Sequence, residues 1–540
     1  FTHKHAWYTH GAVLKLKDSL PDFFNVEKVA RLAASHHNPS DWAEWIIAES
    51  DRISSGADRT ERELESEGKG NAKEQACLSV FSSVKLKTEA HPQEVFYKIN
   101  PLSPDNSVPT TTFRNSVASY KTALDGLLSD LSAIRSNSFD SWILAADAAL
   151  EHWTWAIPST TIDQPDISLY DHLRTTATFA DVLYGYHEKN KNLDIVTAIK
   201  DLDSKKFLFV SGDVSGIQKY IFDIKTDTSS SKLVRARSFE LGAISASAAR
   251  KIQRKFDLSH FAQISNAGGR FLMMLPNNND SSSLLEQIIK EIELEMLNKY
   301  FGFVSFVLSK GIEASKRDLN QDAFSDLFAL IMADSTNAKH KKLQSALSEH
   351  GHIMGSEYEK IEAAIREGGS VCPVCEMRAK QLASDACIVC SSLTKLGSIL
   401  PKAASMYISK AGKDGFLLLD GEYLKLQESK AEQGAANGFI SIHEYVKGAG
   451  LARMPYIAPR TDYEIMDFAT IAKRAKGAKH LAMFKADLDS LGAVFSFGLG
   501  KTVSISRYAT LSRTLDYFFS TVIRDLIEKN EDSKYIYSVF

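Results

Sequence analysis

Two apolar stretches that lie far apart in the chain share one pattern. Residues 207–217 and 481–491 each contain an apolar run, a polar residue, a small residue, an aspartate and then further aliphatic residues. An apolar run of this length predicts a strand that is buried in a sheet. We therefore expect two such strands to place Asp213 and Asp487 at the rim of a sheet, where a carboxylate can hold a divalent metal against nucleotide phosphates.

The similarity continues beyond each aspartate. Apolar residues at helical spacing predict a helix over about 239–256, and residues 262–275 predict two strands joined by a Gly-Gly turn. After the second aspartate, the pattern predicts a helix over about 506–528 and a strand over 535–540. The chain therefore resembles a duplicated unit of strand, helix and strand.

The position of the turn bears on whether this duplication is real. The turn consists of Gly268 and Gly269, and Gly268 lies 55 residues after Asp213. The same offset from Asp487 falls at position 542, just past Phe540. A chance similarity between two short segments is the alternative, and the matching turn position counts against it.

Helical patterns also dominate the N-terminal part of the chain. An amphipathic helix is expected over about 29–35, and residues 38–41, with a proline near the first turn, are typical of the start of a second helix. The proline-containing segment 91–113 predicts an extended linker with a strand at 95–99. Residues 114–195 predict further helices.

Composition restricts the class of protein more than it identifies a function. The chain has 540 residues, of which 44% are hydrophobic and 24% charged, with a net charge of −3, as in ordinary globular proteins. No apolar run reaches the 18 residues of a membrane span, so no membrane partner is expected. Five cysteines and the absence of a signal peptide predict a cytoplasmic protein, although residues are expected before Phe1. Basic clusters at 232–237, 339–342 and 473–480 are candidates for RNA contacts, with solvated surface as the alternative.

Four of the five cysteines form the most specific local signal. They form two CxxC pairs with eleven residues between them, and the turn residues Gly369 and Pro373 lie beside the first pair. Four thiolates on two tight turns predict a tetrahedral zinc site, and the absence of an open position predicts a structural role. The expected zinc ligands are Cys372, Cys375, Cys387 and Cys390.

Histidines are concentrated near the N-terminus. His36 and His37 end the first predicted helix, and Asp51 lies on the second. Histidine and aspartate from neighbouring helices can hold metal ions that activate water against a phosphodiester. We therefore regard these three residues as candidate metal ligands, with His5 as a weaker candidate. Histidines buried for packing, with aspartates that cap helices, are the alternative.

In their order and spacing, these motifs resemble one known family. The chain is similar to the large subunit of type III CRISPR–Cas effector complexes, and is closest to subtype III-A. The segments that carry the resemblance are His36-His37, residues 48–56, residues 166–172, residues 212–218, residues 235–238, the two CxxC pairs and residues 486–492.

The resemblance implies an α+β multidomain fold. It implies an HD-type helical nuclease domain, two ferredoxin-like Palm domains related to GGDEF proteins and nucleotide cyclases, and a zinc-binding helical domain between the Palms. The expected order is a nuclease domain at 1–90, a linker strand and helices at 91–204, a first Palm at 205–345, a zinc-binding domain at 346–454 and a second Palm at 455–540.

The resemblance also implies activities, cofactors and partners. On binding target RNA, a complex of this kind converts ATP to cyclic oligoadenylate and cleaves single-stranded DNA in antiviral defence. The expected cofactors are a structural zinc ion, Mg or Mn at the second Palm and Mn, Co or Ni at the HD domain. The expected partners are a guide CRISPR RNA, target RNA, single-stranded DNA, ATP, and the backbone and small subunits of the complex.

Individual residues take roles from this resemblance. Asp487 is expected to bind catalytic metal, with the Leu488 carbonyl as a further ligand, and Asp489 either binds metal or caps the following helix. The family's Gly-Gly-Asp-Asp turn and His-Asp dipeptide are absent from the sequence. The first Palm has Arg270 and Phe271 after its Gly-Gly pair, so it should bind nucleotide rather than catalyse. Its expected nucleotide-binding residues are Asp213, Ser215, Gly216, Gly268 and Gly269.

Two other functions compete with this interpretation. The chain could be an inactive scaffold that senses RNA within the same complex, a reading that the absent aspartate turn favours. It could instead be a stand-alone nucleotide cyclase with an HD phosphodiesterase, although the CxxC insertion and the unequal Palm copies argue against this.

Overall fold

A computed structural model describes most of the chain. It describes residues 4–537 apart from 59–74, 87–92, 113–114, 161–164, 191–193, 226–228, 351–354, 368, 382–383, 411–413, 431–438, 455–464, 485–487, 489–490 and 531–534. Among these residues, no helix has both the length and the apolar character needed to cross a bilayer.

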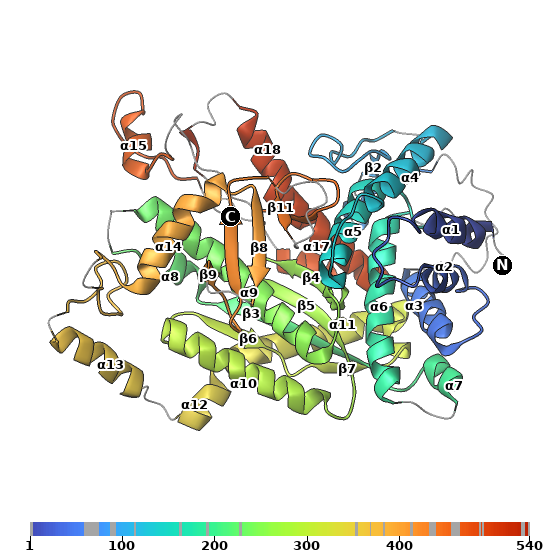
Figure 1. The fold of residues 1–540 in the computed structure, drawn as a ribbon, viewed down its shortest axis with the longest axis horizontal. Helices are drawn as coiled ribbons and strands as arrows, with labels where there is room; N and C mark the ends of the chain where they lie inside the picture. The colour runs from blue at the N-terminus through green and yellow to red at the C-terminus, as the bar shows by residue number, and fades with distance from the viewer. Residues whose placement is uncertain are drawn as a thin grey trace.

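Helices form the N-terminal part of the structure, as the sequence predicts. Helix α3 (Trp42–Asp58) begins where expected, because Asp41 accepts the Glu44 amide while Glu44 accepts the Ser40 amide. This helix packs along α6 (Leu169–Lys189), beside α1 and α2 (Figure 1). The other helices before the central sheet are α1 (Lys4–Lys15), α2 (Val26–Ala34), α4 (Val117–Leu131), α5 (Phe139–Thr154) and α7 (Ile195–Lys200), and a two-stranded ribbon joins β1 (Cys77–Leu78) to β2 (Phe96–Tyr97).

The first predicted Asp-bearing strand is the centre of the main sheet. Strand β3 (Phe207–Ser215) pairs antiparallel with β5 (Arg270–Pro276) and β6 (Ser305–Leu308), and β4 (Gln263–Ala267) pairs with β5. The order β4-β5-β3-β6 is that of a split βαβ fold, with β7 (Ile312–Ala314) also paired to β3. The ferredoxin-like pattern expected for the first Palm is therefore present in this sheet.

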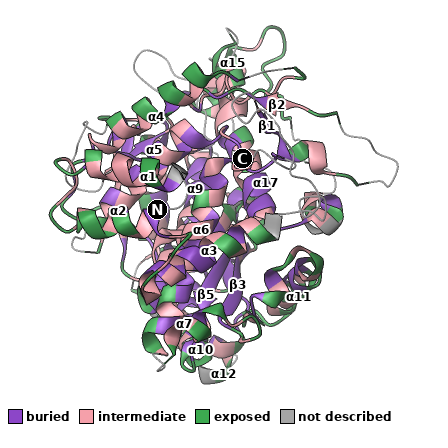
Figure 2. Cartoon of the chain, turned by 90° about the vertical axis from the view of Figure 1, so that its right-hand side faces the viewer, coloured by how far each residue is buried: buried purple, intermediate pink, exposed green. Residues whose placement is uncertain are grey.

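Both faces of this sheet are covered, which explains the uninterrupted apolar run of β3. Leu208 and Val210 pack into a core with α9 (Ser230–Phe256) and α10 (Ser281–Tyr300). Phe207 and Phe209 point to the other face and pack with residues of α6. A strand between two cores has no polar face, so its sequence does not alternate. Figure 2 shows β3 and β5 as buried strands.

Residues after 340 are less helical than predicted. A second sheet of five strands, in the order β12-β11-β8-β10-β9, follows helix α14 (Ile388–Ile399). The prediction of a helical region at 346–454 is therefore incomplete, because short strands with exposed residues give weak periodic signals. The strands are β8 (Ser405–Ser409), β9 (Phe416–Leu417), β10 (Tyr423–Gln427), β11 (Ile440–Ile442) and β12 (Gly450–Ala452).

The remaining helices surround these two sheets. The predicted helix at 506–528 is present as α17, a π-helical segment and α18. The bounds are α8 (Ile217–Phe222), α11 (Gln321–His340), α12 (Gln344–His350), α13 (Gly355–Arg366), α15 (Phe468–Lys473), α16 (Leu491–Ala493), α17 (Ile505–Tyr517), the π-helix Phe518–Val522 and α18 (Ile523–Glu528).

The second predicted Asp-bearing strand is not a strand in this structure. Residues 481–484 have no regular secondary structure, and the side chains of Met483 and Phe484 are 92% and 91% exposed. Residues 535–537 likewise form no strand. A strand needs a paired neighbour for its backbone N–H and C=O groups, and no described strand pairs with residues 481–484 or 535–537. The predicted strand–helix–strand repeat is therefore seen only at its helix, and the domain boundaries remain predictions.

Candidate functional site

The N-terminal histidines and Asp51 come together at one pocket. His36 and His37 follow the C-terminus of α2, and their ring centroids lie 4.1 Å apart. His36 Nδ1 lies 3.1 Å from the Ala33 carbonyl oxygen, so this nitrogen carries a proton. A pocket of about 190 Å³ is lined by His36, His37, Asp51, Arg52 and Ser55.

A residue missed among the sequence candidates completes this cluster. His172 lies in the first turn of α6, and its Nε2 is 3.1 Å from Asp51 Oδ1. Polar residues recur at helical spacing through this part of the sequence, and the structure buries them, so their spacing is a signal that could have pointed to this helix. This buried polar stripe consists of Ser168, Asp171, Thr175 and Thr178, which flank His172.

Electrostatics keeps Asp51 ionised. Burial alone would raise the pKa of Asp51, but the hydrogen bond to His172 and the nearby positive charge of His172, His36 and His37 outweigh it. The net pKa of this carboxyl group therefore lies below its ordinary value. A carboxylate beside two imidazoles offers the mixed oxygen and nitrogen donors that suit divalent transition metals. These donors are less tightly gathered than the cysteines described below.

In the first sheet, the predicted turn lies beside the predicted aspartate. Gly268 and Gly269 both have positive φ and form a two-residue hairpin turn between β4 and β5. In this register Asp213 pairs with Arg270, and its Oδ2 is 2.5 Å from Lys339 Nζ of α11. The carboxylate of Asp213 is therefore already neutralised by a lysine.

Gly216 has a structural reason to be glycine. Its φ of +94° lies in the left-handed region, and an added Cβ would lie 2.2 Å from the Phe303 carbonyl oxygen. Close approach of this chain segment to Phe303 explains the residue without a nucleotide. Contact of Ser215 and Gly216 with nucleotide remains a prediction.

The catalytic candidates of the second predicted Palm are outside the described residues. Asp487 and Asp489 both belong to the segments that the structure does not describe. Leu488 between them is partly exposed and has no regular secondary structure. The proposed metal ligation by these residues therefore remains a prediction.

The four cysteines form a compact buried cluster. One Sγ atom from each of Cys372, Cys375, Cys387 and Cys390 lies within 4.8 Å of the others, the only such metal-ligand group in the described parts of the chain. The Sγ atoms of Cys375 and Cys387 are 3.9 Å apart. Zn–S bonds of about 2.3 Å place tetrahedral sulfurs roughly 3.8 Å apart, so this cluster can hold a zinc ion.

The protonation of the cluster is also consistent with a cation. Hydrogen bonds from Cys387 and Cys390 lower the pKa of the Cys375 thiol, whereas hydrogen bonding with Cys375 raises the pKa of Cys387 to about 11. When no cation is present, thiolates packed this closely repel one another, so deprotonation of one thiol opposes deprotonation of its neighbours. A divalent ion removes this competition because it binds all four as thiolates.

We predict that the double substitution of Cys387 and Cys390 by serine abolishes zinc binding and lowers the melting temperature. The thiols pack in a core with Leu233 of α9 and Leu393 of α14, so metal loss leaves this core without its cross-link. Elemental analysis and thermal unfolding measure both effects. Cys77→Ala removes a buried thiol outside the cluster and should keep the zinc. Full zinc content in the double variant would contradict the assignment.

The two arginines of one predicted basic cluster do not face solvent. Arg235 and Arg237 of α9 are buried. Arg235 donates to the Gly397 carbonyl, and Arg237 donates to the carbonyls of Tyr220 and Asp223. The expectation that these two arginines contact RNA is therefore wrong, because a helix buried between two sheets uses its cations to satisfy carbonyl groups.

Two family models match separate parts of the chain. Residues 206–354 match the model described as Csm1 subunit domain B, and residues 480–539 match the second palm domain of Cas10/Cmr2. A relative from Thermococcus onnurineus, named "CRISPR system single-strand-specific deoxyribonuclease Cas10/Csm1 (subtype III-A)", is 28% identical over 90% of this chain. The chain is therefore similar to the Cas10/Csm1 large subunits of subtype III-A. The predicted resemblance to type III large subunits is thereby confirmed.

The similarity extends to other curated relatives. A relative of the same name from Methanocaldococcus jannaschii is 24% identical over 94% of the chain. The chain spans 60% of the length of the Thermococcus relative and 71% of the Methanocaldococcus relative.

Solved structures support the same fold. The Csm1–Csm4 subcomplex of a type III-A interference complex gives a TM-score of 0.69 at 18% identity, covering 98% of this chain and 67% of that chain. Crystal structures of a Csm1–Csm4 cassette with one ATP and with cA4 give TM-scores of 0.69 and 0.67, at the same identity and coverage.

Proposed function

We propose that this chain is the large subunit of a type III-A RNA-guided effector complex and that its N-terminal pocket cleaves single-stranded DNA with the help of a divalent metal. The observation that carries this proposal is the cluster of Asp51 and His172 with His36 and His37 at one pocket. The names of the curated relatives support the substrate, since they are described as single-strand-specific deoxyribonucleases.

The residues around the pocket suit phosphodiester cleavage. Asp51, His36 and His37 would hold a divalent ion, of which Mn, Co and Ni suit this donor set. When bound, such an ion supplies an activated water and Lewis-acid stabilisation of the phosphate. Arg52 lines the same pocket and is oriented by Glu49, with Arg52 Nη1 2.5 Å from Glu49 Oε1. Its guanidinium would neutralise charge on the DNA phosphate.

We propose as a second activity the conversion of ATP to cyclic oligoadenylate by the second-palm region. The match of residues 480–539 to a second palm domain and the ATP and cA4 complexes of similar structures support it. Asp487 would hold Mg or Mn there, with Leu488 and Asp489 as further candidates. In the first sheet, Lys339 already neutralises Asp213, which supports a nucleotide-binding or structural role rather than catalysis.

The other proposed components follow from the family. We propose a structural role for zinc at the cysteine cluster, and assembly with a guide RNA, target RNA and other subunits. The similar structures are complexes of Csm1 with Csm4, which supports one of these subunit contacts.

The proposal is tested on the full-length protein assembled with its guide RNA. Labelled single-stranded and double-stranded DNA are incubated with the complex, target RNA and Mn²⁺, with a chelator as the control. Metal-dependent cleavage of the single strand alone supports the nuclease. An intact complex that binds target RNA but neither cuts DNA nor converts ATP would identify an inactive scaffold instead.

A further inference from the structure

A line of hydrogen bonds runs from the pocket into another part of the chain. His172 Nδ1 is 3.0 Å from Ser54 Oγ, and Ser54 Oγ is 2.9 Å from Thr175 Oγ1. Thr175 Oγ1 is in turn 3.2 Å from Ser506 Oγ on α17. Since His172 also contacts Asp51, five side chains form one continuous relay.

The ionised carboxylate of Asp51 sets the direction of this relay. A carboxylate only accepts, so His172 Nε2 donates to Asp51, and when the imidazole is neutral its Nδ1 accepts from Ser54. Each hydroxyl has one proton, so Ser54 accepts from Thr175, which in turn accepts from Ser506.

A competing arrangement leaves one of these contacts without a proton. Thr175 Oγ1 also lies 3.0 Å from the carbonyl oxygens of Asp171 and His172. If Thr175 donated to either carbonyl while His172 is neutral, its oxygen would face the Ser54 oxygen at 2.9 Å with no hydrogen between them. Ser54, Thr175 and Ser506 are all buried, so water cannot easily supply the missing donor.

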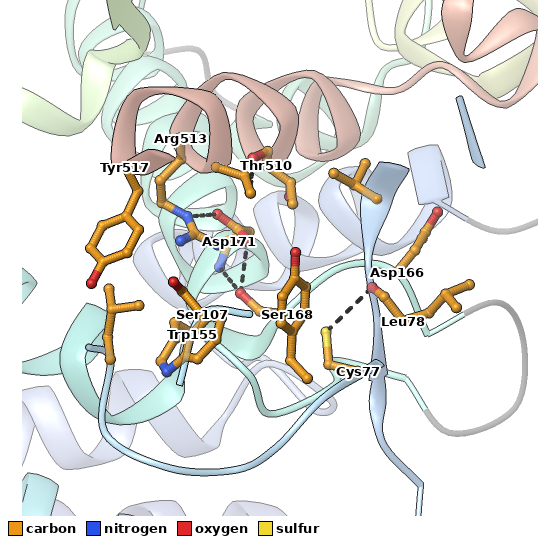
Figure 3. A pocket seen from close by; sticks show the side chains of 14 residues that line it. Cys77, Leu78, Ser107, Trp155, Asp166, Ser168, Asp171, Thr510, Arg513 and Tyr517 are labelled. Atoms are coloured by element: carbon orange, nitrogen blue, oxygen red, sulfur yellow. Dashed lines mark hydrogen bonds and ion pairs between the residues drawn. The ribbon is translucent and has the colours of Figure 1, made fainter. Parts of the chain in front are cut away.

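Two largely buried ion pairs join α17 to α6 and to the segment just before it, next to this relay. Arg513 contacts Asp171 at 2.7 Å, and Arg507 contacts Asp166 at 2.9 Å. Figure 3 shows Arg513 of α17 pointing at Asp171 beside a cavity of about 30 Å³. This cavity has room for about one water molecule, so the contact between α17 and α6 is tightly packed and leaves no space for a ligand. The position of Ser506 relative to α6 is therefore well defined.

We propose that His172 is a positioning residue for Asp51, and that Ser506 of the second-palm region anchors it through Thr175 and Ser54. This inference rests on the proposed nuclease function. His172 is not among the residues that line the pocket, so it acts through Asp51 rather than on the DNA. Partners of this kind that orient metal ligands typically contribute about 10–100-fold in metal affinity or activity.

The inference is tested with variants of the full-length protein in its complex. Affinity for Mn²⁺ is measured by electron paramagnetic resonance after the cysteine cluster has been loaded with zinc. The Mn²⁺ bound by the Asp51→Asn variant is subtracted as binding that does not depend on Asp51. The kcat and KM for single-stranded DNA are measured on the same variants. His172→Leu should weaken Mn²⁺ binding about 10–100-fold. His172→Gln should recover part of this loss because its amide N–H can replace Nε2–H. A merely structural histidine would not distinguish these two variants.

Removal of distant hydroxyls gives the sharper test. Thr175→Val and Ser506→Ala should each weaken Mn²⁺ binding or lower kcat by roughly 2–10-fold, the size of one hydrogen bond, with KM for DNA unchanged. The matched control is Thr178→Val on the same helix, whose buried hydroxyl donates to the Phe261 carbonyl at 2.6 Å, outside the relay. This control should lower the melting temperature without changing Mn²⁺ affinity.

The outcomes separate the inference from the proposed function. Wild-type Mn²⁺ affinity and kcat in both Thr175→Val and Ser506→Ala would overturn the relay while leaving the nuclease intact. Mn²⁺ binding that depends on Asp51 and Ser506, without DNA cleavage, would support the relay and overturn the nuclease function. Absence of Mn²⁺ binding that depends on Asp51 would overturn both.

Discussion

Asp51→Asn is expected to reduce Mn²⁺-dependent cleavage of single-stranded DNA by more than 100-fold. The loss should exceed the about 10–100-fold typical of residues that only orient a ligand, because the carboxylate itself would hold the metal. Asparagine keeps the shape and can still accept from His172, so the substitution mainly removes charge. The cleavage rate of a labelled strand under single-turnover conditions measures the effect.

A neighbouring aspartate provides the control for this experiment. Asp41 caps the N-terminus of the same helix, and asparagine caps helices about equally well. Asp41→Asn should therefore retain cleavage close to that of the unaltered protein. His37→Ala should lose Mn²⁺-dependent cleavage as Asp51→Asn does. If Asp51→Asn cuts DNA at the unaltered rate, Asp51 does not hold the catalytic metal.

Features that depend on neighbouring residues in the sequence were predictable here. The run at β3, the Gly-Gly hairpin and the helices α2, α3 and α9 each follow from a local pattern. The two CxxC pairs were predictable for the same reason, because the two ligands of each pair lie in one turn. In these cases the residues that form the structure are neighbours in the sequence, so they also form the pattern that predicts it.

Features that depend on distant contacts were not predictable. His172 meets Asp51 across 121 residues, and nothing in the sequence near either residue specifies the other. The ion pair of Asp213 with Lys339 likewise joins residues that lie far apart in the sequence. Residues 481–484 show the converse case, since an apolar run forms a strand only where a neighbouring strand is present to pair with it.

The relay connects the second-palm region to the N-terminal pocket. Helix α17 lies within the region that matches a second palm domain, and its Ser506 contacts Thr175 of the buried polar stripe that flanks His172. The sites of the two proposed activities would thus be connected through the buried contact between α17 and α6. A substitution in α17 would therefore alter the proposed nuclease pocket without any contact with DNA.

Asp487→Ala is expected to abolish the conversion of ATP to cyclic oligoadenylate in the full-length complex. Metal ions contribute several kcal/mol to such transition states, and each 1.36 kcal/mol is tenfold in rate, so loss of a ligand should cost about 1,000-fold or more. Chromatography of the products formed from labelled ATP measures the rate. Co-purification of the guide RNA and partner subunits should be unchanged.

The corresponding aspartate of the first sheet is the matched control. Asp213→Asn leaves Lys339 without its ion-pair partner but removes no proposed catalytic ligand, so turnover at saturating ATP should stay within a few-fold of the unaltered rate. Normal oligoadenylate synthesis by Asp487→Ala would reject Asp487 as a metal ligand. Loss of synthesis in Asp213→Asn alone would place the catalytic carboxylate in the first sheet instead, because only one of these two aspartates would then be required for turnover.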